Sequence, residues 1–188
     1  MKQQKSFSFG IIFIVVFGLF SCVDEVSTSI ETDPYFDLKG FIEEHILQFD
    51  SVQVTKTSQI QGEEKEVKVI YSKEDWEEEL SIFKEADINK ASMLQSYKTS
   101  QSDDLLIHEA LPKSKEKVKY IKVAYENGIV SSVSIKIADD NLFYSSSTLA
   151  EIYIDHSTQL IDRYSISSSQ KIWFLDENNM IIKGSVAP

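Results

Sequence analysis

The second half of the chain is a succession of short strand-like segments joined by brief polar turns. Among these turns Asn127-Gly128 is the strongest hairpin signal, because both residues tolerate the positive φ of a two-residue turn. Parallel neighbours need a crossover of a dozen residues or more, so these connections predict one antiparallel meander. The predicted strands are Leu105–Leu111, Val118–Tyr125, Ile129–Ala138, Leu142–Ser147, Leu149–Asp155, Gln159–Ser167, Lys171–Leu175 and Met180–Val186.

The meander is predicted to have one apolar face and one polar face. Within Ile129–Ala138, Val133 and Ile135 alternate with Ser134 and Lys136, so the two kinds of residue point to opposite sides of the sheet. An antiparallel sheet of this type buries one face and leaves the other in water. The apolar face therefore needs a cover from elsewhere in the chain.

Two amphipathic helices in the first half are the expected cover. The first is predicted to begin at Asp33-Pro34, an N-cap acceptor followed by proline. The second begins at Ser72, with Asp75 as its capping-box partner. Their apolar stripes are formed by Leu38, Phe41, Ile42, His45 and Phe49 in the first, and by Trp76, Leu80 and Phe83 in the second.

The remaining segments complete a prediction of fold class. Residues 52–54 and 67–71 alternate in polarity on either side of Gly62-Glu63 and predict a hairpin, whereas residues 86–104 are predicted to be an irregular connection. We therefore predict an α+β domain in which a curved antiparallel meander packs against two N-terminal amphipathic helices.

The N-terminus has the features of a secretory signal. Lys2 and Lys5 precede an apolar run from Phe7 to Phe20, and no acidic residue occurs before Asp24. The run is 14 residues long, whereas a helix needs about 20 apolar residues to cross the hydrocarbon core. Its length matches the core of a cleaved signal peptide.

The four residues that end this segment, Leu19-Phe20-Ser21-Cys22, resemble the lipobox of bacterial lipoproteins. The resemblance implies cleavage before Cys22, acylation of its thiol and attachment to a membrane. Residues 1–21 would then be the signal peptide, residues 22–33 the acylated cysteine with a flexible tether, and residues 34–188 a single domain. Asp24-Glu25 resembles the acidic pair of many lipoproteins exported by the Bacteroidota, which implies the outer membrane, on its periplasmic or its surface side.

Charge and cysteine content exclude several classes of function. The chain has 19 basic and 30 acidic residues, a net charge of −11, which argues against a nucleic-acid partner. Removal of residues 1–21 takes away Lys2 and Lys5 and no acid, so the mature balance is 17 − 30 = −13. The single cysteine excludes an internal disulfide and a CxxC zinc or redox site.

The polar residues that could carry catalysis all have structural interpretations. His45 lies on a helix stripe, His108-Glu109 lies within a strand, and Asp155-His156 ends one. The sequence contains no GxSxG elbow, P-loop or GxGxxG motif. The serine runs indicate a solvated face, and the acidic pairs indicate turns. The serine runs are Ser145–Ser147 and Ser167–Ser169, and the acidic pairs are Asp103-Asp104 and Asp139-Asp140. We predict no catalytic residue, metal or cofactor.

Three hypotheses for function remain open. The first is a non-enzymatic lipoprotein that binds an envelope protein or assembles with one. The second is a half-barrel for a lipid or another hydrophobic ligand, and the third is an envelope hydrolase in which His108, His156 and Asp155 converge.

Aromatic residues in the last strands are predicted to be mainly core, with a hint of a second apolar surface: Phe143, Tyr144, Tyr153, Tyr164, Trp173 and Phe174.

Overall fold

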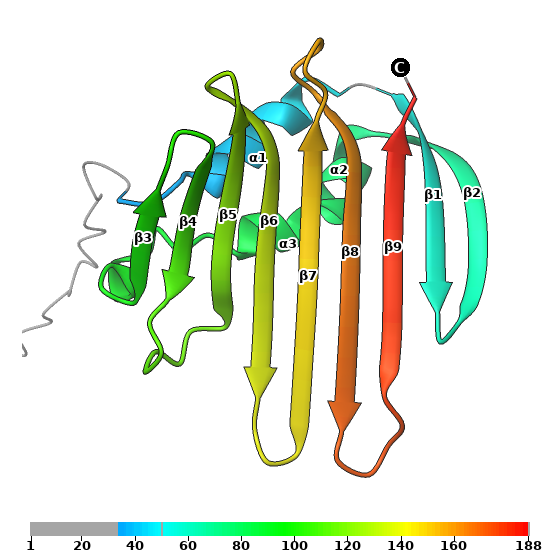
Figure 1. The fold of residues 1–188 in the computed structure, drawn as a ribbon. Coiled ribbons are helices and arrows are strands. Elements are labelled where there is room, and N and C mark those ends of the chain that lie inside the picture. The colour runs from blue at the N-terminus through cyan, green and yellow to red at the C-terminus, as the bar shows by residue number, and fades with distance from the viewer. Residues whose placement is uncertain (1–33, 50, 188) are drawn as a thin grey trace, which may run out of the picture.

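Nine antiparallel strands form one open, curved sheet in the computed structural model, which describes residues 34–49 and 51–187 (Figure 1). The strands are β1 (Val52–Ile60), β2 (Glu63–Tyr71), β3 (Tyr97–Gln101), β4 (Leu105–Ala110), β5 (Val118–Glu126), β6 (Ile129–Asp140), β7 (Tyr144–Ile154), β8 (Ile161–Ile172) and β9 (Asn178–Val186). The helical elements are α1 (Leu38–Leu47), α2 (Lys73–Glu79), α3 (Ser81–Glu85) and the 3₁₀ turn η1 (Ala91–Met93).

The order of the strands confirms the predicted α+β class and the antiparallel meander. From β3 to β9 each strand pairs with its neighbour in sequence, and the overall order is β2-β1-β9-β8-β7-β6-β5-β4-β3. The predicted hairpin is β1–β2, whose turn residues Gln61 and Gly62 both have positive φ. It joins the meander through β9, where Val54 pairs with Val186.

Several predicted strand boundaries were wrong. β7 is one strand where two were expected, and β8 joins most of the predicted strand Gln159–Ser167 to the first two residues of Lys171–Leu175. The serine runs lie within β7 and β8 and pair across these two strands, and the Thr148 and Ser168 hydroxyls lie 3.0 Å apart in a hydrogen bond. β3 was predicted as irregular chain, because a short polar edge strand lacks the alternation that marks a half-buried one.

The helices also differ from the prediction. α1 begins at Leu38 rather than at Pro34, and the Asp37 carboxylate caps it by accepting a hydrogen bond from the Gly40 N–H. The capping box of Ser72 and Asp75 is confirmed at the start of α2. The second predicted helix is divided at Leu80 into α2 and α3, and both lie between β2 and β3 in sequence.

The core lies between the helices and one face of the sheet (Figure 1). Trp76 of α2 is fully buried and stacks on Phe49, with 4.5 Å between ring centroids. Its indole also meets the Tyr164 ring edge-on at 6.0 Å, which connects the helix layer to β8. Burial of such large side chains is the main stabilising contribution. The opposite face of the sheet has no helix against it in the described residues.

Gly184 is required by the packing of Tyr164. The two residues are directly paired across β8 and β9, and the Tyr164 ring lies over the Gly184 backbone. A Cβ atom at position 184 would overlap the ring carbons of Tyr164. The absence of a side chain in β9 therefore lets a buried aromatic residue lie flat against the sheet.

We expect Gly184→Ala to lower the free energy of unfolding by about 2–3 kcal/mol, because overpacking forces Tyr164 from its position. Urea denaturation measures the change. Gly62→Ala is the control, since its φ is positive but open space surrounds the position. It should cost about 1 kcal/mol. Equal costs for the two variants would contradict this account of Gly184.

Candidate functional site

The uncovered face of the sheet carries a row of polar side chains that the strand register brings together. Lys122 of β5 pairs with Ser134, Ser134 with Glu151, Glu151 with Ser165, and Ser165 with Lys183 of β9. Residues directly opposite one another in an antiparallel sheet share a face. Their neighbours in sequence, such as Ile121, Ile135 and Ala150, are buried on the helix side. The row therefore crosses the middle of the uncovered face.

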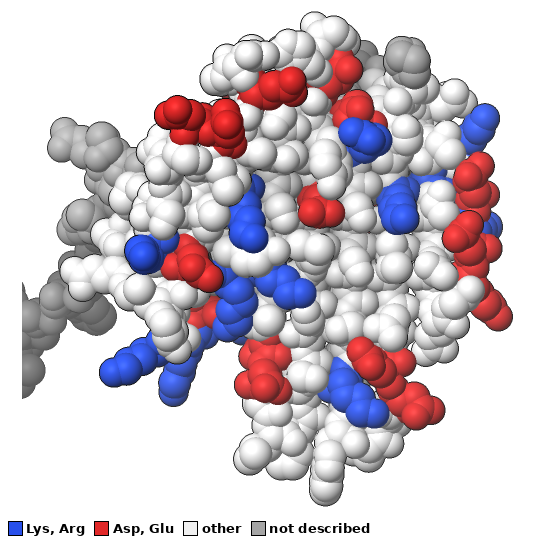
Figure 2. Space-filling model, viewed as in Figure 1, with Lys and Arg blue, Asp and Glu red and all other residues white. Residues whose placement is uncertain are grey.

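Basic residues gather on this face although the protein is acidic. Adjacent rows add Lys136 of β6 and Arg163 of β8. Figure 2 shows blue side chains over the middle of the face with a red one among them, and the other red ones mostly toward its edges. Among the described residues no carboxylate lies within ion-pair distance of the three lysines, whereas Arg163 Nε lies 3.2 Å from Asp162 Oδ2. We call these four residues the cationic patch: Lys122, Lys136, Arg163 and Lys183.

Two tyrosines hold cations of the patch against the sheet. Lys122 Nζ lies 4.3 Å from the centroid of the Tyr120 ring, and the Arg163 guanidinium lies 5.0 Å from that of Tyr153. Such contacts favour a cation at a fixed position over a ring face. Burial raises the pKa of Tyr153, and the negative charge and hydrogen bond of Glu151 add to this effect. Tyr153 therefore remains a neutral hydrogen-bonding group at physiological pH.

A shallow depression of about 410 Å³ lies beside the patch, between β1, β2, β7, β8 and β9. Its lining on the uncovered face combines two cations and several hydroxyl groups, which donate hydrogen bonds, with one carboxylate, Glu66 of β2. Donors and cations therefore outnumber the single anionic side chain. The residues that line it on the uncovered face include Thr55, Thr57, Arg163, Ser165, Lys183 and Ser185.

His45 and His108 have structural roles. His45 is buried on α1, where a ring nitrogen lies 2.8 Å from the Phe41 carbonyl oxygen. His108 is buried on β4, and its Nε2 accepts a hydrogen bond from the Phe36 N–H at 3.0 Å. Burial lowers the pKa of His108, which keeps this nitrogen an acceptor. His108 thus fastens the segment before α1 to the sheet.

The structure does not bring His108, His156 and Asp155 together. His156 and Asp155 lie in the turn after β7, and β5 and β6 separate β7 from β4, a distance of about 14 Å across the sheet. Asp155 caps its own turn by accepting hydrogen bonds from Ser157 and Thr158, which lower its pKa to about 2. Among the described residues no three His, Cys, Asp or Glu side chains form a group that could hold a metal.

Glu79 is the centre of a polar network that the sequence did not reveal. Lys56 Nζ lies 2.6 Å from Glu79 Oε2, the Tyr71 hydroxyl donates to the same oxygen at 3.1 Å, and the Tyr164 hydroxyl donates to Oε1 at 2.7 Å. The acidic residues Glu77, Glu78 and Glu79 end α2. For Glu79 the structure adds three partners on β1, β2 and β8, so this carboxylate ties α2 to the sheet.

The network shifts two pKa values upward. Burial disfavours the Lys56 ammonium, but hydrogen bonds and the charge of Glu79 outweigh burial and raise its pKa. Burial raises the pKa of Tyr164, and the hydrogen bond to Glu79 adds to the shift. Both groups therefore keep their protons in the folded protein to a higher pH than in the unfolded chain.

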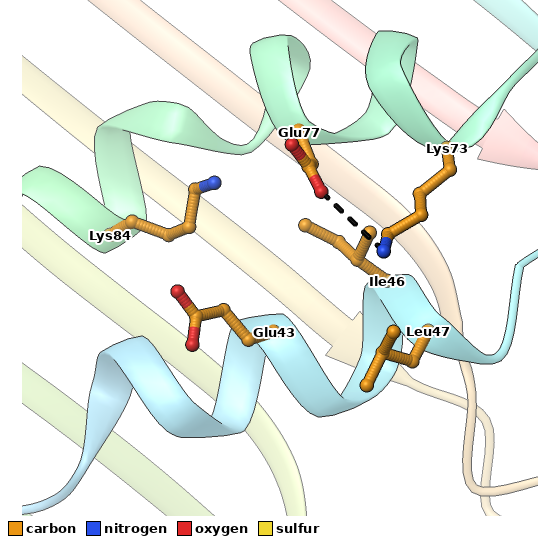
Figure 3. Close-up of a pocket in the computed structure, with 6 residues that line it drawn as sticks. All are labelled: Glu43, Ile46, Leu47, Lys73, Glu77 and Lys84. Atoms are coloured by element: carbon orange, nitrogen blue, oxygen red, sulfur yellow. Dashed lines mark ion pairs between the residues drawn. The ribbon is translucent and has the colours of Figure 1, made fainter.

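A groove of about 300 Å³ crosses the outer surface of the helix layer between α1 and the α2–α3 pair (Figure 3). Lys73 and Glu77 form an ion pair at 3.8 Å on one wall. Glu43 on the other wall faces toward Lys84 across the groove. The charged residues that line the groove are two acids, Glu43 and Glu77, and two bases, Lys73 and Lys84. The lining therefore has no net charge that would select a charged ligand.

The aromatic residues of the last strands divide among three places. Tyr164 is core, and Tyr153 lies on the uncovered face. Phe143, Trp173 and Phe174 were predicted within strands, with neighbours on opposite faces, and this was wrong. They lie in the turns after β6 and β8 and are more than half exposed.

Comparison with protein-family models, curated proteins and solved structures found no match. Cys22, the predicted site of lipid attachment, lies outside the described residues. Within those residues, no helix has the length and apolar character needed to cross a membrane.

We expect Glu79→Gln to lower the free energy of unfolding at pH 7 by about 1–3 kcal/mol, because it removes the charge that Lys56 and Tyr164 bind. Because the pKa values of Lys56 and Tyr164 are raised in the folded protein, the stabilisation by Glu79 is complete below about pH 10, where both groups are protonated even in the unfolded chain. It declines as pH rises through the folded pKa values. Wild type should therefore lose more stability between pH 9 and 11 than the variant. Urea denaturation across this range is the measurement.

Glu78→Gln is the matched control, because Glu78 lies on the same helix and is exposed. Its unfolding free energy should follow that of wild type within about 0.5 kcal/mol. A Glu79→Gln variant with the stability of the Glu78 control would show that the network contributes nothing to the attachment of α2.

Proposed function

We propose that the protein is a non-enzymatic lipoprotein of the outer membrane that binds an acidic partner protein through the uncovered face of its sheet. The observation that carries this proposal is the cationic patch, a concentration of basic side chains on one face of a protein with 30 acidic residues. Charge complementarity of this kind gives an interface its specificity and its rate of association.

The size and composition of the face suit a protein surface. Nine strands spaced about 4.8 Å apart, with central strands about 35 Å long, give a face on the order of 1,000 Å². A specific protein complex needs about 800 Å² from each partner. Arg163 and the two patch tyrosines are of the residue types enriched at such interfaces. The face is broad and shallow, which suits another folded surface.

The lipid anchor rests on the sequence of the N-terminus. Two lysines, a short apolar run and the Leu19-Phe20-Ser21-Cys22 motif favour acylation of Cys22, and Asp24-Glu25 favours the outer membrane. Two or three acyl chains hold a protein stably at a bilayer, whereas one chain is marginal. Residues 22–33 would then act as a tether that holds the domain away from the lipid.

The packing of the helices supports this function over the half-barrel alternative. A carrier of hydrophobic ligands needs an apolar cavity between the sheet and its helices. Here Leu38 of α1, Trp76 of α2 and Phe83 of α3 are fully buried within the same core as the sheet residues. In this proposal the helix layer is a cover for the apolar face, and the opposite face is the one that binds.

We expect Cys22→Ala to release the protein from membranes, because the thiol that carries the diacylglycerol is lost. Fractionation of cells that express the full chain, with mass spectrometry of the N-terminal peptide, measures anchorage and acylation. Val23→Ala is the neighbouring control and should remain acylated and membrane-bound. If Cys22→Ala is processed and anchored as wild type is, the lipoprotein assignment is overturned.

We expect the triple charge reversal Lys122→Glu/Lys136→Glu/Lys183→Glu to weaken partner binding at least about tenfold, because like charges then face an acidic surface. A photo-crosslinking amino acid at Ser134, in the centre of the patch, reports the contact in intact cells. The expected crosslink is to one acidic protein, and in isolated membranes it should weaken as salt rises.

The control reverses three exposed lysines away from the patch, Lys39, Lys65 and Lys90, and makes the same change in net charge. It should crosslink at Ser134 as the wild type does. Equal loss in the two triple variants would mean that net charge, and not the patch, governs binding. A crosslink that is insensitive to the patch variant would overturn the proposed binding face.

A further inference from the structure

Five large hydrophobic side chains are exposed together at one end of the sheet. Leu142 and Phe143 occupy the β6–β7 turn, and Trp173, Phe174 and Leu175 occupy the β8–β9 turn. Each of these residues is between 51% and 89% exposed. We call these five residues the apolar tip. In Figure 1 the two turns form the lower end of the sheet, beyond the helices.

The two turns form one unit. The Trp173 N–H donates to the Phe143 carbonyl oxygen at 2.9 Å, and the two rings meet edge-on with centroids 6.3 Å apart. The Asn141 side chain accepts a hydrogen bond from the Phe143 N–H at 3.0 Å, and Lys171 Nζ donates to the Leu175 carbonyl oxygen at 2.7 Å. These bonds fix the backbone of both turns, so the apolar side chains are held outward.

Exposed apolar residues occur singly on most protein surfaces, but a contiguous cluster marks an interaction site. The tip is convex, because it consists of two protruding turns, and a convex apolar surface suits a soft layer into which it can sink. Tryptophan and phenylalanine are residues that favour the headgroup boundary of a bilayer. Lys171 lies beside them, where a lysine can extend its charge toward water while its stem contacts lipid.

The turns at this end carry charges of both signs. The β4–β5 connection contributes Lys113, Lys115 and Lys117 against Glu116, the β8–β9 turn contributes Asp176 and Glu177, the end of β6 contributes Asp139 and Asp140, and the β1–β2 turn contributes Glu63 and Glu64. Lys117 pairs with Asp139 at 2.8 Å. Because acids outnumber bases here, the contact with lipid rests on the exposed apolar side chains and not on charge attraction.

The described chain begins within reach of this end. Phe36 lies beside His108 on β4, roughly 30 Å from the tip when strand spacing and residue rise are combined. The twelve residues 22–33 span at most about 40 Å when fully extended. An acylated Cys22 and the tip can therefore contact the same membrane at once.

We propose that the apolar tip inserts into the phospholipid headgroup layer of the membrane to which Cys22 anchors the protein. This inference rests on the proposed lipid anchor. The anchor holds the tip at high local concentration, so a contact too weak to bind alone becomes stable. Two points of attachment orient the domain with its strands standing on the membrane, and they turn the cationic patch sideways.

The tryptophans provide a direct measurement of insertion. The chain has two: Trp76 is fully buried and Trp173 is 73% exposed, so acrylamide quenching reports mainly Trp173. The acylated mature protein is placed in vesicles of phosphatidylethanolamine and phosphatidylglycerol (3:1), and the same chain without acyl groups, free in buffer, is the reference. We expect a blue-shifted emission in vesicles, at least about threefold weaker acrylamide quenching, and quenching by lipids brominated near the headgroup.

The variant Phe143→Ser/Phe174→Ser keeps Trp173 as the reporter and removes two of its apolar neighbours. Loss of two phenyl rings should lower the inserted fraction about tenfold or more. The matched control is Leu47→Ser/Ile70→Ser, two exposed apolar residues elsewhere, which should insert as wild type does. Circular dichroism and thermal unfolding verify that both variants are folded.

The outcomes separate the insertion of the tip from the lipid anchor. Mass spectrometry reports acylation of Cys22, and its absence would overturn the anchor itself. If the protein is acylated but Trp173 in vesicles stays as accessible to acrylamide as in the reference free in buffer, tip insertion is overturned and the anchor stands. Equal lipid quenching in the Phe143/Phe174 variant and the control would overturn it as well.

Discussion

The difference between the two faces of the nine-stranded sheet determines the rest of this structure. Alternating strands put their apolar residues on one side, and three short helices cover that side. In the described residues nothing is packed on the other side, so it must remain compatible with water. Serine, threonine and charged residues fill it, and cations can be placed there freely because the core does not depend on them. One constraint thus produces both the buried core and the cationic patch.

A single carboxylate connects the helix layer to the sheet by polar bonds. Glu79 receives its partners from three strands, and they surround it near the indole of Trp76. The Trp76 Nε1 is buried without a hydrogen-bond partner, so apolar packing, and not polar pairing, fixes that residue. Hydrophobic contact attaches α2 to the sheet, and the hydrogen bonds and ion pair of Glu79 set the position of α2 along the strands.

Sequence patterns predicted the structural features that depend on residues close together in the chain, and they missed those that depend on residues far apart in sequence. The hairpin turns and the Ser72 capping box were found because their signals are local. β3 was missed because it is an edge strand that pairs only with β4, and its polar sequence lacks the alternation of a half-buried strand. β7 appeared as two strands because its serines interrupt the apolar alternation. The Glu79–Tyr164 bond joins residues 85 apart in sequence. The cationic patch draws on four strands, so only the register reveals it.

The proposed contacts act in different directions, and the fold explains why they can coexist. Turns that end β6 and β8 lie along the strand axis, whereas the patch faces perpendicular to the sheet. An acidic domain tends to be repelled by anionic lipid, so the end with exposed apolar side chains is where it can approach the membrane. With that end in the lipid, the patch lies several residues higher on the same strands, clear of the headgroups. A membrane-bound protein with this geometry presents its cations to a neighbouring protein and not to lipid phosphates.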